Sequence, residues 1–412
     1  MKKITVNYAG WGEQWPLGTL AESGHELLFE YSKEALQRGL ELSPRHLKLG
    51  PETFGGFPLF QHRLPGLIAD CLPDGWGLLL MDRFFKKHRG LDAHQITALD
   101  RLAFLGDRAM GALTFEPADT TKLVPSELEL MALARAVREV VSNNAESALQ
   151  QLVLIGGSPH GARPKALVQY DPDTQLMSTL PTAPGSAWLV KFPAQNEAAE
   201  VCALEHVYAE MARNCGLDMP RTQYFTLADG LAAFATERFD RTDGHRVPMH
   251  TLAGALHADF RIPNMSYQSM LRMTRLMTRS EHEVLNAFQR CVFNVVFNNR
   301  DDHTKNFSYL LNKQGNWRLA PGYDLTFCEG LCGEHQMDIE GEGKVPGLTH
   351  LMALAKHAGL EKAACLLIIE RVAEHALLFD DEARKHSIIS NETRRKIHKA
   401  IMGNLARLRR AL

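Results

Sequence analysis

Asp301, Asn306 and Asp324 are the residues whose types and spacing are best suited to chemistry. Carboxylate and amide oxygens are hard ligands of the kind that Mg²⁺ prefers, and a carboxylate can also accept the proton of an attacking hydroxyl. Phosphoryl transfer needs both functions in one place, because the protein contributes positioning and charge to it rather than covalent chemistry. These three side chains therefore predict a phosphoryl-transfer site, provided that the fold brings them together.

A predicted β-hairpin would bring two of them together. The strand-like runs 307–311 and 317–320 are separated by a polar turn sequence that contains Gly315. Gly315 is nine residues from Asn306 and nine from Asp324. The folded hairpin would therefore place these two side chains at its open end.

The same spacing occurs in protein kinases, where an Asp base is followed by a metal-binding Asn and, after a hairpin, by a metal-binding Asp. Asp301 and Asn306 match the first part of this pattern, and Asp324, within Gly-Tyr-Asp, matches the second. His303 in the loop is more typical of atypical and small-molecule kinases. Arg300 could bind an activating phosphate, as in regulated kinases, or backbone carbonyl groups, which we expect.

A kinase also needs groups that hold the nucleotide, and candidates lie upstream. Residues 155–165 form a glycine-rich loop with Ser158 and Gly161, but the loop matches neither common phosphate-loop pattern, and a plain loop is an equal alternative. Lys191 ends an apolar strand and Glu205 lies on the apolar face of the next helix, so they could form the lysine–glutamate pair of a kinase. An edge lysine and an exposed glutamate are the alternative.

The order of the predicted elements gives the domain organisation. Residues 1–117 predict a small α+β subdomain and 243–412 a mainly helical region. Between them, 118–242 predict a kinase-like N-lobe that begins with a helix at 126–141 and continues, over 150–240, as a mostly antiparallel sheet with one helix. The apolar run 152–155 is predicted to be a strand. We therefore expect an α+β, bilobal protein-kinase-like fold with an extra N-terminal α+β subdomain and a mainly α-helical C-terminal lobe.

Composition restricts the class of protein. The 412 residues include 46 Lys+Arg and 48 Asp+Glu, so no chain-wide positive field favours nucleic acid or an anionic membrane. The arginines of the last helix are expected to form a solvated face rather than a binding patch. Seven cysteines without a Cys-x-x-Cys pair indicate reduced thiols, with a zinc site as the alternative. With no long apolar run, we expect a cytoplasmic protein that does not cross a membrane.

Motifs along nearly the whole chain resemble the HipA-like kinase toxins of bacterial type II toxin–antitoxin systems. Residues 64–77 and 105–113 are similar to the N-terminal subdomain of that family. Residues 157–166, 236–241 and 301–308 are similar to its core motifs. The combination is specific even where a single motif is not.

The resemblance implies a Ser/Thr protein kinase and a role for each matching residue. Asp301 would be the catalytic base, and Asn306 and Asp324 would hold Mg²⁺. The implied ATP-binding residues come from the glycine-rich loop, the lysine–glutamate pair, a hinge that contacts adenine through its main chain, and the catalytic loop: Ser158, Gly161, Lys191, Glu205, Glu237, Arg238, Phe239 and His303.

The resemblance also implies regulation and partners. Autophosphorylation of Ser158 would add roughly two negative charges beside the ATP phosphates and silence the kinase. The partner would be a small helix-turn-helix antitoxin (HipB-like), through which alone the chain would reach DNA, and the substrate a protein, such as an aminoacyl-tRNA synthetase. Two other interpretations stay open: a catalytically silent HipA-like protein that regulates transcription with the antitoxin, and a small-molecule kinase.

Overall fold

The computed structural model describes residues 2–119, 129–141, 149–157 and 159–409. The chain divides into two compact units. Unit 1 comprises Met1–Ala199, Gln223–His250 and Leu311–Gly315, and unit 2 comprises Glu200–Thr222, Thr251–Leu310 and Asn316–Leu412.

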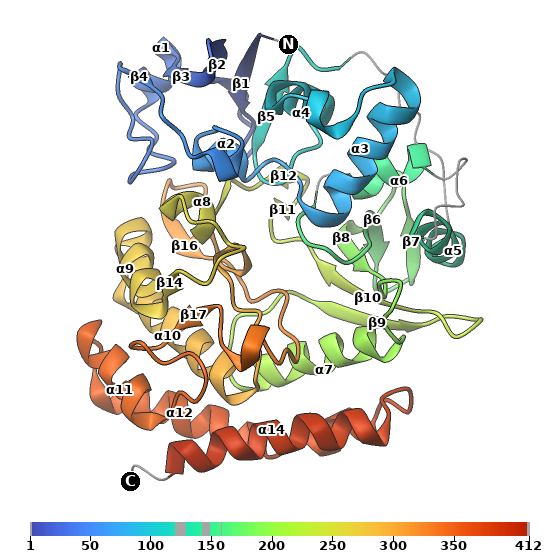
Figure 1. Cartoon of the computed structure of the whole chain (residues 1–412), viewed down its shortest axis with the longest axis vertical. Helices are drawn as coiled ribbons and strands as arrows, with labels where there is room; N and C mark the ends of the chain where they lie inside the picture. The colour runs from blue at the N-terminus through green and yellow to red at the C-terminus, as the bar shows by residue number, and fades with distance from the viewer. Residues whose placement is uncertain (1, 120–128, 142–148, 158, 410–412) are drawn as a thin grey trace. The chain divides into compact units, whose positions relative to one another are not determined.

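The first sheet of unit 1 has five strands in the order β4-β3-β2-β1-β5, and all neighbours are antiparallel (Figure 1). Its strands are β1 (Lys3–Tyr8), β2 (Trp15–Ser23), β3 (Glu26–Tyr31), β4 (Thr53–Phe54) and β5 (Leu113–Glu116). The accompanying helices are α1 (Lys33–Arg38), α2 (Gly66–Ala69), α3 (Gly75–Arg89) and α4 (Ala98–Leu105), with short 3₁₀ turns at Leu59–Gln61 and Ala93–Gln95. Ile4, Val6 and Tyr8 of β1 are buried, the period of two expected of a strand with one face against a core.

The second sheet of unit 1 has the order β7-β6-β8-β10-β9, so β8 is an interior strand. Its strands are β6 (Lys165–Asp171), β7 (Leu176–Ser178), β8 (Ser186–Lys191), β9 (Thr222–Thr226) and β10 (Ala232–Glu237), and two short strands, β11 (Arg241–Thr242) and β12 (His245–Arg246), follow. The antiparallel pairing of β6 with β7 and of β8 with β6 and β10 confirms the predicted antiparallel sheet.

The prediction of a strand at 152–155 is wrong, because this run belongs to the helix α6 (Leu149–Gly156), which follows α5 (Leu130–Val141). Leu152, Val153 and Ile155 are buried, and α6 packs against α3. A short apolar run fits a buried helix as well as a buried strand, and only the neighbouring elements decide between them.

Unit 2 is mainly helical, and α10 (Glu281–Val296) contacts three of its helices, α9, α12 and α14 (Figure 1). The other elements that belong wholly or mostly to unit 2 are α7 (Glu200–Asn214), α8 (Leu252–Leu256), β14 (Met265–Ser266), α9 (Tyr267–Thr278), β15 (Ser308–Leu311), β16 (Trp317–Leu319), β17 (Met337–Asp338), α11 (Leu348–His357), α12 (Lys362–Ala376), α13 (Phe379–Arg384) and α14 (Asn391–Arg409), with 3₁₀ turns at Thr304–Asn306 and Leu331–Gly333. Strand β13 (Met249–Thr251) lies at a boundary between the units.

The start of α10 contacts the hairpin that follows the helix in the chain. The Ser280 hydroxyl accepts a hydrogen bond from the Glu283 N–H, so Ser280 caps the start of the helix. The Glu283 carboxylate does not return to Ser280 but accepts from the N–H of Leu319 on β16, 3.2 Å away. The start of α10 is thereby joined to the predicted hairpin, which is present as β15 and β16.

The last helix, α14, has one apolar face. Ile397, Ile401, Leu405 and Leu408 are all buried. Within the ranges that the structure describes, no helix is both long and apolar enough to cross a membrane.

Candidate active site

Two neighbouring aspartates in the loop between α10 and β15 differ in solvent exposure. The Asp301 side chain is 52% exposed, whereas the Asp302 side chain is completely buried. Since successive residues of an extended loop point in opposite directions, anchoring one presents the other to solvent. Asp301 therefore has the exposure that a general base needs to reach a substrate.

Asn306 is brought to Asp301 by a hydrogen bond within the loop. Its Nδ2 donates to the backbone carbonyl of Asp301 over 2.8 Å. The side-chain Oδ1 is then the Asn306 atom that can bind a cation. The predicted Asp-x4-Asn pair is thus held within one closed turn, which ends in the 3₁₀ turn Thr304–Asn306.

His303 lies inside the same turn. Its Nε2 is 3.9 Å from Oδ1 of Asp301, and its ring is 5.4 Å from the Phe260 ring, centroid to centroid. Its Nδ1 is buried and has no hydrogen-bond partner among the described residues. A buried polar atom without a partner calls for water or a ligand, which fits a place beside a bound molecule.

Asp324 directly follows Tyr323, which forms hydrogen bonds with the end of the loop between α10 and β15 and with the start of that strand. We call this loop, residues 297–307, the catalytic loop because it contains the proposed base. The Tyr323 hydroxyl donates to the carbonyl of Lys305 over 2.6 Å and lies 2.6 Å from Oγ of Ser308. Asp324 has φ of 55°, in the left-handed region that costs a non-glycine residue energy. Such strain is concentrated at functional sites, so it supports a role for this carboxylate. Tyr323 was not predicted; its only sequence signal is its place next to Asp324.

Asn306 and Asp324 have the chemistry of Mg²⁺ ligands. The described residues contain no group of three or more His, Cys, Asp or Glu side chains that could hold a metal ion. Mg²⁺ bound with a nucleotide needs only one or two protein oxygens, because phosphates and water supply the remainder. An amide oxygen and a carboxylate fit a site of that kind.

Arg300 binds backbone carbonyl groups, as predicted. One terminal nitrogen donates to the carbonyl of Gly333, and the other donates to that of Lys344 over 3.0 Å. These acceptors belong to residues 328–344, which we call the 328–344 segment. Arg300 therefore holds this segment beside the catalytic loop without an added phosphate.

In unit 1 the glycine-rich loop rests on the turn that begins α3. The Gly161 N–H donates to the Asp74 carboxylate, and the Gly161 carbonyl accepts from the Trp76 N–H over 3.0 Å. Gly161 has φ of 100°, which favours glycine, and a Cβ on Gly75 would lie 2.6 Å from the Gly161 carbonyl oxygen. Ser158 lies outside the residues that the structure describes.

Two lysines share one face of the second sheet. The Cα of Lys191 on β8 pairs with that of Lys165 on β6, so their side chains lie on the same side. Both residues are buried, and the Lys165 ammonium donates to the carbonyl of His160 in the glycine-rich loop. Lys165 was not predicted, although a lysine that opens a strand directly after a glycine-rich loop is a usable signal.

The alternative of an edge lysine and an exposed glutamate is wrong. Lys191 is 7% exposed on an interior strand, and Glu205 on α7 is 2% exposed. Lys191 belongs to unit 1 and Glu205 to unit 2. Their pairing therefore stays a prediction.

The predicted hinge, Glu237 to Phe239, continues the β10 strand. Glu237 pairs with Trp188, and the Arg238 N–H donates to the Ala187 carbonyl over 2.8 Å. The Arg238 N–H is therefore already used, and a main-chain contact to adenine would have to come from other atoms of the hinge.

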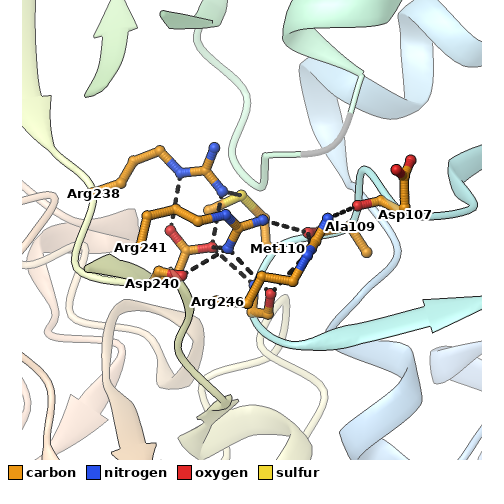
Figure 2. A network of polar contacts seen from close by, with 8 residues as sticks. Asp107, Ala109, Met110, Arg238, Asp240, Arg241 and Arg246 are labelled. Carbon is orange, nitrogen blue, oxygen red and sulfur yellow. Dashed lines mark hydrogen bonds and ion pairs between the residues drawn. The ribbon is translucent and has the colours of Figure 1, made fainter. Parts of the chain in front are cut away.

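The Arg238 side chain belongs to a buried network centred on Asp240 (Figure 2). Arg238 donates twice to the Asp240 carboxylate, each over 2.9 Å, and Arg241 donates over 2.7 Å. Burial alone would raise the pKa of the Asp240 carboxyl, but the two guanidinium groups and the Gly111 N–H lower it well below its usual range. Burial lowers the pKa of Arg241 to about 9.

The network joins distant parts of unit 1. The N–H of Gly111, two residues before β5, donates to Asp240 over 2.8 Å. Arg241 and Arg246 both donate to the Ala109 carbonyl, over 3.2 and 3.3 Å (Figure 2). The residues beside the predicted hinge are thereby fixed to residues 107–111, which lie within the run 105–113 that resembles the N-terminal subdomain of the HipA-like kinases.

The comparisons with known proteins agree with this architecture. The family model of the HipA-like C-terminal domain matches residues 157–377, more than half of the chain, and that of the HipA N-terminal domain matches residues 10–116. A Haemophilus influenzae protein named "Putative kinase" is 26% identical over 32% of this chain and 43% of its own length. "Putative kinase Y4mE" of Sinorhizobium fredii is 33% identical over 28% of this chain and 30% of its own. The chain thus spans less than half of either relative.

A solved structure extends the likeness to the whole fold. HipA from Shewanella oneidensis MR-1, in a complex with HipB and operator DNA, superposes with a TM-score of 0.70 at 17% identity, covering 99% of this chain and 97% of that one. The predicted α+β kinase-like fold of the HipA type is therefore confirmed. From the two family models and this fold, the chain belongs to the HipA-like family.

Proposed function

We propose that this protein is an ATP- and Mg²⁺-dependent serine/threonine protein kinase that acts as the toxin of a toxin–antitoxin module. The observation that carries the proposal is the catalytic loop, in which a half-exposed Asp301 is joined to Asn306 by a hydrogen bond. The family membership and the kinase names of the relatives support it.

The reaction follows from the atoms of the loop. A substrate hydroxyl attacks the γ-phosphorus of ATP, the Asp301 carboxylate accepts the hydroxyl proton, and the bond to the β–γ bridging oxygen breaks so that ADP leaves. When bound by Asn306 and Asp324, Mg²⁺ supplies charge that neutralises the phosphates. Lys191, oriented by Glu205, would contact the phosphates. The proposed hinge would contact adenine.

The proposal includes partners and regulation. A HipB-like helix-turn-helix antitoxin is the proposed partner, because the solved relative is in a complex with HipB and operator DNA. Contact with DNA would then pass through the antitoxin. A protein, such as an aminoacyl-tRNA synthetase, is the proposed substrate, and Ser158 is the proposed site of autophosphorylation.

The proposal is tested by incubating the purified chain with γ-labelled ATP, Mg²⁺ and dephosphorylated casein. Replacing Asp301 by Asn should lower transfer about 10²–10⁴-fold, because the general base is lost, while ATP binding by calorimetry is kept. Asp381→Asn, the same change at an exposed aspartate of α13, is the control and should keep full transfer.

Two results would contradict the proposal. Equal transfer by the wild type and Asp301→Asn would show that Asp301 is not the base. ATP binding by the wild type without transfer to any protein would instead favour the catalytically silent interpretation, or a small-molecule kinase if a metabolite accepted phosphate.

A further inference from the structure

Asp302, the neighbour of the proposed base, is the centre of a buried polar network in unit 2. Its carboxylate accepts three hydrogen bonds: from the Tyr267 hydroxyl over 2.7 Å, from Nδ1 of His335 over 2.7 Å and from the Gln336 N–H over 2.8 Å. The side chains of Asp302 and His335 are 0% and 1% exposed. Water cannot readily replace a donor lost from this network.

The network continues into α10. Nδ2 of Asn294 donates to the Tyr267 hydroxyl over 2.9 Å, and Nδ2 of Asn299 donates to Oδ1 of Asn294 over 3.0 Å. Burial, followed by the nearby Asp302 carboxylate, raises the pKa of Tyr267 well above its usual range, so its hydroxyl stays a donor. The catalytic loop is thus anchored to α9 and α10 on both sides of Asp301.

Residues of the catalytic loop before and after Asp301 both contact the 328–344 segment. Before Asp301, the backbone of Asn299 bridges to Cys328, and Arg300 binds the carbonyls of Gly333 and Lys344. After Asp301, Asp302 binds His335 and Gln336. The segment follows Asp324 in the chain, the position of the activation segment in protein kinases.

Regulated kinases order this segment by phosphorylation, which creates a new phosphate–arginine pair. Here the corresponding arginine is already used by carbonyl groups, and a buried aspartate–histidine contact adds a second attachment. We propose that Asp302 and His335 form a positioning pair that fixes the 328–344 segment to the catalytic loop, so that Asp301 is held ready for transfer without phosphorylation of that segment. The inference rests on the proposed kinase function.

The test compares three variants of the full chain. His335→Leu removes the donor to Asp302. His335→Asn keeps an N–H near the position of Nδ1. His375→Leu is the control, because it removes a histidine hydrogen bond of similar length, 2.8 Å between Nδ1 and the Arg371 carbonyl, within α12 and outside the 328–344 segment.

The kcat and KM for transfer to casein separate positioning from binding. His335→Leu should lower kcat about 10- to 100-fold, as expected for a misplaced catalytic group. It should leave the KM for ATP within about twofold, because the His335 side chain is only 1% exposed and so is out of reach of a bound nucleotide. His335→Asn should recover most of the rate, and His375→Leu should match the wild type. A rate of His335→Leu equal to that of the wild type would overturn the proposal, and so would an equal loss in His335→Asn.

Amide hydrogen exchange tests the attachment without catalysis. In His335→Leu the 328–344 segment should exchange about tenfold faster, while α10 keeps the protection it has in the wild type. Unchanged exchange would refute the positioning pair even if the kinase function stood. If the wild type transferred no phosphate, the kinase function would fail and the exchange result would still decide whether the pair fixes the segment.

Discussion

Asp240 in unit 1 and Asp302 in unit 2 are both buried carboxylates, yet their partners differ in kind. Asp240 is held by the guanidinium groups of Arg238 and Arg241 (Figure 2) and also accepts from one backbone N–H, that of Gly111. Asp302 is held by a hydroxyl, an imidazole and a backbone N–H. Removing one member of a buried ion pair leaves an uncompensated charge, whereas hydrogen-bond networks of this kind mainly fix geometry. We therefore expect the Asp240 network to control stability and the Asp302 network to control the catalytic loop.

The largest expected effect on stability comes from Asp240→Ala. Two largely buried arginines, with side chains 9% and 18% exposed, would lose their carboxylate, so the free energy of unfolding should fall by about 3–5 kcal/mol. Urea denaturation measures this change. Asp107→Ala is the matched control: the Asp107 carbonyl accepts a hydrogen bond from Arg246, but its side chain is exposed, so stability should change little. A loss of unfolding free energy below about 1 kcal/mol in Asp240→Ala would contradict the conclusion that the Asp240 network controls stability.

A smaller effect should appear as a dependence on pH. The pKa of Asp240 is lowered on folding, so its contribution is complete above the pKa of the unfolded chain, about 3.9, and is lost as the pH falls toward the folded-state value. The stability gap between the wild type and Asp240→Asn should therefore be widest near neutral pH. It should narrow by up to roughly 2 kcal/mol as the medium becomes acidic. Thermal melts across this range measure the gap; a constant gap would show that the arginines do not set the charge of Asp240.

The smallest expected effect concerns the Asp302 network. Tyr267→Phe removes one donor to Asp302 and should lower the free energy of unfolding by about 1–2 kcal/mol. Tyr309→Phe is its control, because the buried Tyr309 hydroxyl lies 3.0 Å from Oγ1 of Thr274 in the same unit, and no hydrogen bond between Tyr309 and Asp302 is described. Both variants should lose similar stability, but only Tyr267→Phe should slow transfer, by a few-fold. Equal rates in the two variants would argue against a positioning role for the Asp302 network.

Local pattern was enough to predict much of the fold. The turn at Gly315 and the mainly helical character of 243–412 both depend on neighbours within a few residues, and both are present. The strand prediction for 152–155 was wrong because the local pattern of this run fits a helix and a strand equally. The run forms the helix α6, which packs on α3.

In the candidate site, too, features that depend on nearby residues were predictable and features that depend on distant residues were not. The Asp301–Asn306 spacing was readable because both residues lie in one short turn, which a hydrogen bond closes. The roles of Asp302 and Lys165 were not readable, since each depends on partners brought in by folding: His335 is 33 residues from Asp302 in the chain, and the Lys165–Lys191 pairing requires a sheet register.

The sequence by itself determined which residues we propose to carry the chemistry, because a reactive group and its spacing within one turn are local properties of the chain. The tertiary structure alone decided which aspartate faces solvent, which is buried and what partners the buried one has. Burial and hydrogen bonding depend on contacts between segments far apart in the chain, and the Asp240 and Asp302 networks are both of that kind.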